Sequence, residues 1–219
     1  MTDASERLAA VQAGLERACR DAGRTDCPTL VAVSKTFDVD AIRPLIAAGQ
    51  REFGENRVQE AQAKWPALIA ETPDIVLHLV GQLQSNKAAE AVALFDVIHG
   101  VDRASLVTAL AKAQAASGRR PICYLQVNIG DEAQKGGCAL ADLPALLEQA
   151  RAADLNIAGL MCVPPANVES APFFALLAEH ARRQGLSGLS MGMSGDYETA
   201  ALLGATAVRV GSALFGTRA

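Results

Sequence analysis

A lysine in the first third of the chain has the sequence context expected of a residue that binds a carbonyl compound. Lys35 directly follows the mostly apolar run of residues 29–34. A lysine that ends a buried strand at the mouth of a barrel is partly desolvated, which disfavours the charged ammonium form. A neutral lysine amine is a nucleophile that can form a Schiff base with a carbonyl group. Lys35 therefore indicates a ligand with an aldehyde or ketone.

A glycine-containing turn near the end of the chain has the pattern of an anion site. Residues 209–216 read RVGSALFG, so that a strand ends at Val210, Gly211 lacks a Cβ and Ser212 opens a short helix. Backbone N–H groups at such a turn can face an anion, and phosphate sites in barrels often follow the seventh and eighth strands. Ser194, in the preceding loop, can add a hydroxyl contact. Together with Lys35, the turn indicates either pyridoxal 5′-phosphate (PLP) or a sugar phosphate held by a Schiff-base aldolase.

Other polar residues at the expected strand ends are less specific. Asn56 and Asn128 can contact a ring hydroxyl or a substrate, although asparagines at such positions often bond to the local backbone. His78 stands between two leucines, which favours a hydrogen-bonded core histidine over an acid or base. We therefore include Asn56 in the candidate ligand site and leave the roles of Asn128 and His78 open.

Short apolar runs alternate with longer amphipathic stretches along the chain, which predicts parallel β–α units. Several of these runs are continuously apolar, as strands buried on both faces should be. The strands are expected at residues 29–34, 52–54, 75–80, 97–101, 122–128, 156–161, 188–191 and 207–210. The helices are expected at residues 3–23, 38–49, 56–70, 84–94, 103–117, 139–153, 170–184, 195–203 and from residue 212.

Eight strands joined by short loops favour a closed TIM-type (β/α)8 barrel with an extra N-terminal helix. An open doubly wound sheet uses the same alternation. It is disfavoured because the sequence contains no G-x-G-x-x-G loop after the first strand and no Walker A motif. No linker or repeat divides the sequence, so we expect one α/β domain over residues 1–219.

Composition excludes several classes of protein. The 20 basic and 24 acidic residues give a net charge of −4, which offers no electrostatic basis for binding nucleic acid or an anionic membrane. Five cysteines without C-x-x-C spacing predict buried thiols in the cytoplasm, and the three histidines lack zinc-site spacing. The first residues form no apolar signal core. We expect a cytoplasmic monomer.

Five segments of the sequence together resemble one known family. They are residues 31–35, 53–60 (FGENRVQE), 78–87 (HLVGQLQSNK), 192–194 (GMS) and 208–216 (VRVGSALFG). In this order they are highly specific for the pyridoxal phosphate homeostasis proteins, the YggS/PROSC family. The resemblance implies a barrel like that of the alanine racemase N-terminal domain, with PLP bound through Lys35. It also implies a protein that buffers PLP or delivers it to PLP-dependent apoenzymes rather than an enzyme.

The related alanine racemases imply roles for three further residues. By resemblance, Arg209 faces the pyridine nitrogen of PLP, whereas Ser194 and the backbone N–H of Ser212, beside Gly211, bind its phosphate. Gly130 departs from the family, which usually has a serine at that place. No C-terminal β domain follows Arg218, so we expect the second base of a racemase to be missing. A PLP-dependent amino-acid racemase, or a related fold-type III enzyme, is the alternative function.

Overall fold

Eight parallel strands form a closed barrel in the computed structural model, which describes residues 3–216. Each predicted strand is present, and its ends differ from the prediction by no more than one residue. In chain order the strands are β1 (Thr29–Val33), β2 (Glu52–Glu55), β3 (Val76–Leu79), β4 (Val97–Val101), β5 (Ile122–Val127), β6 (Asn156–Cys162), β7 (Gly188–Ser190) and β8 (Ala207–Val210).

Pairing between the first and last strands closes the barrel. β1 pairs in parallel with β8, with Thr29 opposite Ala207 and Ala32 opposite Val210. β1 also pairs with β2 on its other side. The predicted TIM-type barrel is therefore confirmed, and the doubly wound alternative is wrong. Residues 1, 2 and 217–219 lie outside the described residues, and the assignment of one domain to residues 1–219 stays a prediction.

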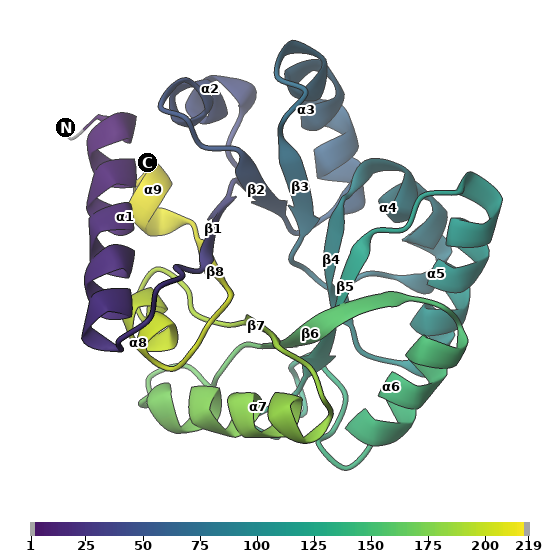
Figure 1. The fold of residues 1–219 in the computed structure, drawn as a ribbon. Helices are drawn as coiled ribbons and strands as arrows, with labels where there is room; N and C mark the ends of the chain where they lie inside the picture. The colour runs from purple at the N-terminus through teal and green to yellow at the C-terminus, as the bar shows by residue number, and fades with distance from the viewer. Residues whose placement is uncertain (1–2, 217–219) are drawn as a thin grey trace.

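Helices surround the barrel (Figure 1), and their buried apolar side chains belong to the same core as those of the strands. The stretch predicted at 84–94 divides into a 3-10 turn and a helix. The one predicted from 139 begins at 143, because the backbone around Cys138 bonds instead to the end of β5. In chain order the helices are α1 (Ala4–Asp21), α2 (Val39–Ala47), α3 (Val58–Glu71), η1 (Ser85–Lys87), α4 (Ala88–Leu94), α5 (Ala104–Ser117), α6 (Leu143–Ala152), α7 (Ala171–Arg183), α8 (Tyr197–Leu202) and α9 (Ser212–Phe215).

The extra N-terminal helix compensates for a short last helix. α9 has only four residues, and α1 lies beside it and beside α8 (Figure 1). Arg7 Nε donates to the Leu214 carbonyl oxygen at 2.5 Å, and Arg17 pairs with Glu198 at 2.8 Å. α1 therefore covers the side of the barrel where β8 meets β1 and holds α9 there.

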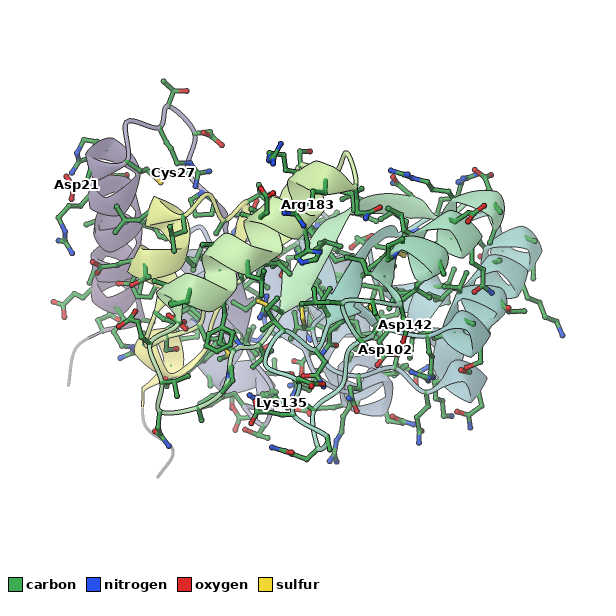
Figure 2. All side chains as sticks on the ribbon, turned by 90° about the horizontal axis from the view of Figure 1, so that it is seen from below. Asp21, Cys27, Asp102, Lys135, Asp142 and Arg183 are labelled. Carbon is green, nitrogen blue, oxygen red and sulfur yellow. The ribbon has the colours of Figure 1, made fainter. Side chains whose placement is uncertain are left out.

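The barrel has one end at the carboxyl ends of its strands and another at their amino ends. In Figure 2, Lys135, which follows the carboxyl end of β5, lies at the opposite end of the barrel from Cys27, which precedes β1.

All five cysteines are free. The prediction of buried thiols is wrong for Cys27, which is exposed because the loop before β1 runs along the surface. Burial raises the pKa of the Cys123 and Cys162 thiols to about 12.

Residues 3–216 contain neither a membrane-spanning helix nor a cluster of metal-binding side chains. No helix in that range is long and apolar enough to cross a membrane. Nor do three or more histidine, cysteine, aspartate or glutamate side chains gather there in a way that could hold a metal ion.

Candidate cofactor site

A cavity of about 490 Å³ opens at the carboxyl ends of the strands. Its volume lies in the range of sites for small molecules and cofactors. It contains all six residues singled out from the sequence, although they lie up to 177 positions apart. The lining residues are Val33, Lys35, Asn56, Val80, Val163, Met193, Ser194, Gly195, Arg209, Gly211 and Ser212.

Lys35 lies in a tight turn that directly follows β1. The strand is buried up to Ser34, whereas Lys35 is half-buried and lines the cavity. The Phe37 N–H donates to the Ser34 carbonyl oxygen at 3.1 Å and closes the turn. Phe37 then stacks on Phe215 of α9, with ring centroids 4.6 Å apart. The turn that carries Lys35 is thus packed against the element that follows β8.

Asn56 lies at the end of β2, on the border between the cavity and a neighbouring groove. Its backbone is pressed against Gly81, where an added Cβ would lie 2.3 Å from the Asn56 carbonyl oxygen. Glycine is therefore required in the VGQLQSNK segment, because it lets the loop after β3 approach the residue after β2.

Ser194 and Gly211 bring the loop after β7 against the end of β8. Ser194 Oγ accepts hydrogen bonds from the backbone N–H groups of Gly211 (3.1 Å) and Ala213 (3.4 Å). Gly192, with φ at +93°, allows the sharp turn into this loop. A hydroxyl that accepts two bonds keeps its own hydrogen as a donor. The Ser194 O–H can therefore serve an anionic oxygen in the cavity.

Gly211 is present for close packing rather than for an unusual backbone angle. Its φ is −117°, which other residues adopt. An added Cβ would lie 3.3 Å from the Val33 carbonyl oxygen at the end of β1. The glycine thus keeps the first residues of α9, including Ser212, close to the strand that leads to Lys35.

Arg209 is a buried cation that points into the barrel and lines the floor of the site. Its Nη1 donates to Ser190 Oγ at 2.6 Å, and its Nη2 donates to the Cys162 carbonyl oxygen at 2.8 Å. Within residues 3–216, the guanidinium forms no ion pair with a carboxylate. Burial lowers the pKa of Arg209 below its ordinary value. An acceptor placed in the cavity would therefore meet a positive charge that the protein has not neutralised at short range.

The Arg209 contact continues across the barrel as a chain of hydrogen bonds. Ser190 Oγ lies 2.7 Å from His99 Nδ1, His99 Nε2 lies 2.9 Å from His78 Nδ1, and His78 Nε2 lies 2.5 Å from Glu52 Oε2. Burial, with the charges of His78 and Arg209, lowers the pKa of His99 well below its ordinary value. His99 is therefore neutral at neutral pH.

The direction of the hydrogen bonds in this chain depends on its two end groups and on the protonation of its histidines. Arg209 can only donate, and the Glu52 carboxylate accepts. When both histidines are neutral, each group accepts from the Arg209 side and donates towards Glu52, so that Ser190 O–H donates to His99 Nδ1. Because Ser190 uses its hydrogen in this way, its oxygen is left to hold the Arg209 guanidinium. We call these five residues, Arg209, Ser190, His99, His78 and Glu52, the Arg209 chain.

Sequence reasoning found the polar lining of the cavity but missed the support beneath it. Asn128, whose role was left open above, bonds to the local backbone, at the Glu132 carbonyl oxygen and N–H. His78 is a buried, hydrogen-bonded histidine, as predicted. Ser190 and His99 were missed. Their only signal is a polar residue inside a short apolar strand, which does not show that the two side chains meet across the barrel.

Comparisons with known proteins agree with this architecture. Residues 7–219 match the family described as "Alanine racemase, N-terminal domain". The pyridoxal phosphate homeostasis protein of Pseudomonas aeruginosa is 42% identical over 100% of this chain and 97% of its own length. The protein of the same name from Escherichia coli K12 is 36% identical over 100% of this chain and 98% of its own length. This chain belongs to the pyridoxal phosphate homeostasis protein family.

Solved structures show the same relationship. PipY from Synechococcus elongatus, solved with PLP bound, has a TM-score of 0.86 and 41% identity. The match covers 97% of this chain and 100% of PipY. Alanine racemase from Clostridium difficile has a TM-score of 0.70 but only 11% identity, and the match covers 55% of that chain. The racemase likeness therefore concerns the barrel fold alone.

Proposed function

We propose that this member of the family binds PLP in the cavity through Lys35 and acts in cytoplasmic PLP homeostasis, as a carrier for PLP-dependent apoenzymes rather than as an enzyme. The observation that carries the proposal is the convergence of Lys35, Arg209 and the Ser194–Gly211 turn on one cavity of cofactor size. The homeostasis proteins that match over the full chain support the biological role. The cytoplasmic location is supported by the five free cysteines.

The residues of the cavity fit the functional groups of PLP. Lys35 supplies the amine, and Arg209 supplies a donor for the ring nitrogen. Asn56 is available to the ring hydroxyl. The Ser194 hydroxyl and the N–H of Ser212 beside Gly211 are available to the phosphate. When bound, PLP would supply an aldehyde carbon that forms a carbon–nitrogen double bond with a lysine amine and releases water.

Arg209 restricts the chemistry that the site can support. The guanidinium is already fully protonated and donates a hydrogen bond without transferring a proton. A pyridine nitrogen held by this donor would stay unprotonated, and the ring would then withdraw electrons weakly. This arrangement favours storage of the cofactor over reactions that need a strong electron sink.

The lining also lacks the second base of a racemase. Of the described residues that line the cavity, Lys35 and Arg209 are the charged ones, and none is tyrosine, histidine or cysteine. Tyr124 stacks on His99 inside the barrel at 4.8 Å, and Tyr197 Oη donates to Glu198 beside α1. Racemisation needs a base on each face of the substrate carbon. The absence of a carboxylate and of a second lysine also disfavours the aldolase alternative.

Binding of two vitamers tests the proposed site. PLP should bind more tightly than unphosphorylated pyridoxal, because pyridoxal leaves the Ser194–Gly211 turn without its anion. Ser194→Ala removes one charge-assisted hydrogen bond and should weaken PLP about 10- to 150-fold, with a much smaller effect on pyridoxal. Equal affinities for PLP and pyridoxal in the unsubstituted protein would overturn the proposed phosphate site.

Turnover tests the proposed absence of catalysis. The purified protein loaded with PLP is incubated with each common L-amino acid, and the products are separated by chiral chromatography. Conversion at about 1 s⁻¹ or faster, the low end of ordinary enzyme rates, and lost in Lys35→Ala, would replace the carrier with the racemase alternative.

A further inference from the structure

The turn that carries Lys35 holds a backbone conformation that its sequence does not favour. Thr36 has φ at +67°, in the left-handed region. Few residues other than glycine adopt this region, and a β-branched residue such as threonine is disfavoured there. Such a conformation persists when the surrounding structure holds it in place, and it is frequent at functional sites. The question is therefore what holds the backbone on either side of Lys35.

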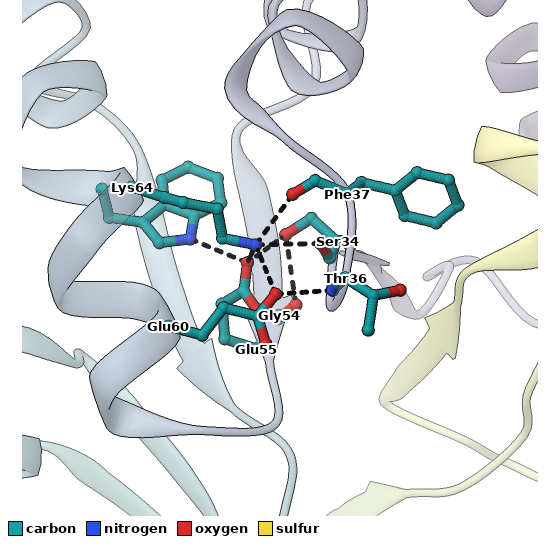
Figure 3. Close-up of polar contacts among 8 residues, drawn as sticks. Ser34, Thr36, Phe37, Gly54, Glu55, Glu60 and Lys64 are labelled. Carbon is teal, nitrogen blue, oxygen red and sulfur yellow. Dashed lines mark hydrogen bonds and ion pairs between the residues drawn. The ribbon is translucent and has the colours of Figure 1, made fainter.

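A buried ammonium group supplies two of the restraints. Lys64, on α3, donates from Nζ to the carbonyl oxygens of Ser34 (3.1 Å) and Phe37 (3.0 Å), the first and last residues of the turn (Figure 3). Its side chain is only 11% exposed. One cation thus bridges the two backbone groups between which Lys35 and Thr36 lie.

Two carboxylates hold that cation and also bind the turn directly. Lys64 Nζ lies 2.7 Å from Glu55 Oε1 and 2.9 Å from Glu60 Oε1. Glu60 Oε1 also accepts the backbone N–H of Thr36 at 2.5 Å, and Glu55 Oε1 accepts the Ser34 hydroxyl at 2.7 Å (Figure 3). We call Lys64, Glu55 and Glu60 the Lys64 cluster.

The electrostatics of the cluster match its role as a restraint. Glu55 is fully buried and also accepts the Trp65 Nε1–H at 3.0 Å, whereas its Oε2 has no hydrogen-bond partner. Burial raises the pKa of Glu60, but its bonds to Lys64 and to the Thr36 N–H, with the charges of Lys64 and Arg57, outweigh burial and lower that pKa. The charged form of Glu60 is therefore favoured, and the bonds from Lys64, Glu55 and Glu60 to Ser34, Thr36 and Phe37 converge on the turn.

We propose that Lys64 is a positioning residue, which with Glu55 and Glu60 fixes the backbone around Lys35 so that the Lys35 amine reaches the aldehyde of its ligand. This inference rests on the proposed function. Lys64 is absent from the residues that line the cavity, so it acts through the turn. A shift of the turn would misplace Lys35 Nζ, whereas within residues 3–216 Lys64 makes no hydrogen bond or ion pair with Arg209 or Ser194.

Two ligands separate positioning from a general structural effect. PLP can bond to Lys35, whereas pyridoxine 5′-phosphate carries an alcohol in place of the aldehyde and cannot. In Lys64→Met, affinity for PLP should fall about 10- to 100-fold, as misplaced reacting groups lose. Affinity for pyridoxine 5′-phosphate should stay within about twofold. Lys112→Met, at an exposed lysine of α5, is the matched control and should change neither.

A second variant keeps the test valid if Glu55 cannot stay buried without its cation. Lys64→Met combined with Glu55→Gln removes both charges and should show the same selective loss of PLP affinity. Equal losses for both ligands, or no loss for either, would overturn the positioning role. Failure of the proposed function looks different, because PLP would then bind no better than pyridoxine 5′-phosphate in the unsubstituted protein, and Lys35→Ala would change neither affinity.

Discussion

Two cations with little solvent exposure, Lys64 and Arg209, lie near the cavity, and their hydrogen-bond partners differ in charge. Lys64 lies within 2.9 Å of two carboxylates, and its hydrogen bonds end on the backbone around Lys35. Among residues 3–216, Arg209 donates hydrogen bonds only to a hydroxyl and a carbonyl oxygen, and it reaches the carboxylate of its chain, Glu52, through Ser190 and two histidines. The Lys64 charge is thus paired with carboxylates of the protein, whereas the Arg209 charge is available to a ligand.

This contrast separates two tasks of the site, which are to position the reactive amine and to contact the ligand. A reactive amine must be placed accurately, and strong ion pairs outside the cavity achieve that without entering it. A group that contacts the ligand must keep bonding capacity, so neutral acceptors hold it instead. The stability of the ligand-free protein should therefore depend on the Lys64 cluster more than on the Arg209 chain.

The largest expected difference is in stability. Lys64→Met leaves the Glu55 carboxylate buried without its cation and should lower the free energy of unfolding by about 3–5 kcal/mol. Arg209→Met leaves only neutral acceptors behind and should cost about 1 kcal/mol. Urea unfolding of the ligand-free protein, followed by the fluorescence of its single tryptophan, Trp65, measures both. Equal losses would remove the distinction between the two cations.

The next difference concerns the ligand. Arg209→Met removes a charge-assisted hydrogen bond to the ring nitrogen and should weaken PLP about 10- to 150-fold, although the ligand-free protein stays nearly as stable. The matched control is Arg183→Met, at an exposed arginine of α7 that pairs with Glu179. Calorimetric titration of both variants measures the effect. An unchanged affinity in Arg209→Met would show that this guanidinium serves the fold alone.

The smallest expected difference is in the pH at which each region loses stability. The folded-state pKa of His99 is lowered from 6.5, so the unfolded chain binds the proton first. The stability that His99 contributes is present above about pH 6.5 and is lost as the pH falls below that value, by at most about 1.4 kcal/mol per pH unit. The pKa of Glu60 is lowered from 4.5, so its contribution is lost only below about pH 4.5 as the pH falls through the folded-state pKa.

Matched variants separate the two pH windows. His99→Phe, which keeps a ring to stack on Tyr124, should flatten the decline between pH 6.5 and 5. Glu60→Gln should change the decline only below pH 4.5. Urea midpoints measured at half-unit pH steps show both effects. A decline between pH 6.5 and 5 that persists unchanged in His99→Phe would contradict the assignment of that window to the Arg209 chain.

The sequence predicted the barrel and the cavity lining well, for local reasons. The hydrophobic periods of strands and helices can be recognised from residues close together in the sequence, and the carboxyl ends of parallel strands lie at the same end of a barrel. Lys35 and Gly211 could therefore be placed together without coordinates. The Lys64 cluster could not, because a glutamate and a lysine at i,i+4, as at Glu60 and Lys64, are common on exposed helix faces. Only the packing of α3 against the turn after β1 shows that this pair ends on the backbone beside Lys35.

Covalent capture of the cofactor at Lys35 tests the central claim most directly. The protein is mixed with PLP, reduced with borohydride and digested, and the peptides are analysed by mass spectrometry, with Lys35→Ala and Lys112→Ala treated in parallel. The account predicts one stoichiometric adduct on the peptide that contains Lys35, absent from Lys35→Ala and unchanged in Lys112→Ala. An unmodified Lys35, or an adduct that persists at the same level in Lys35→Ala, would contradict it.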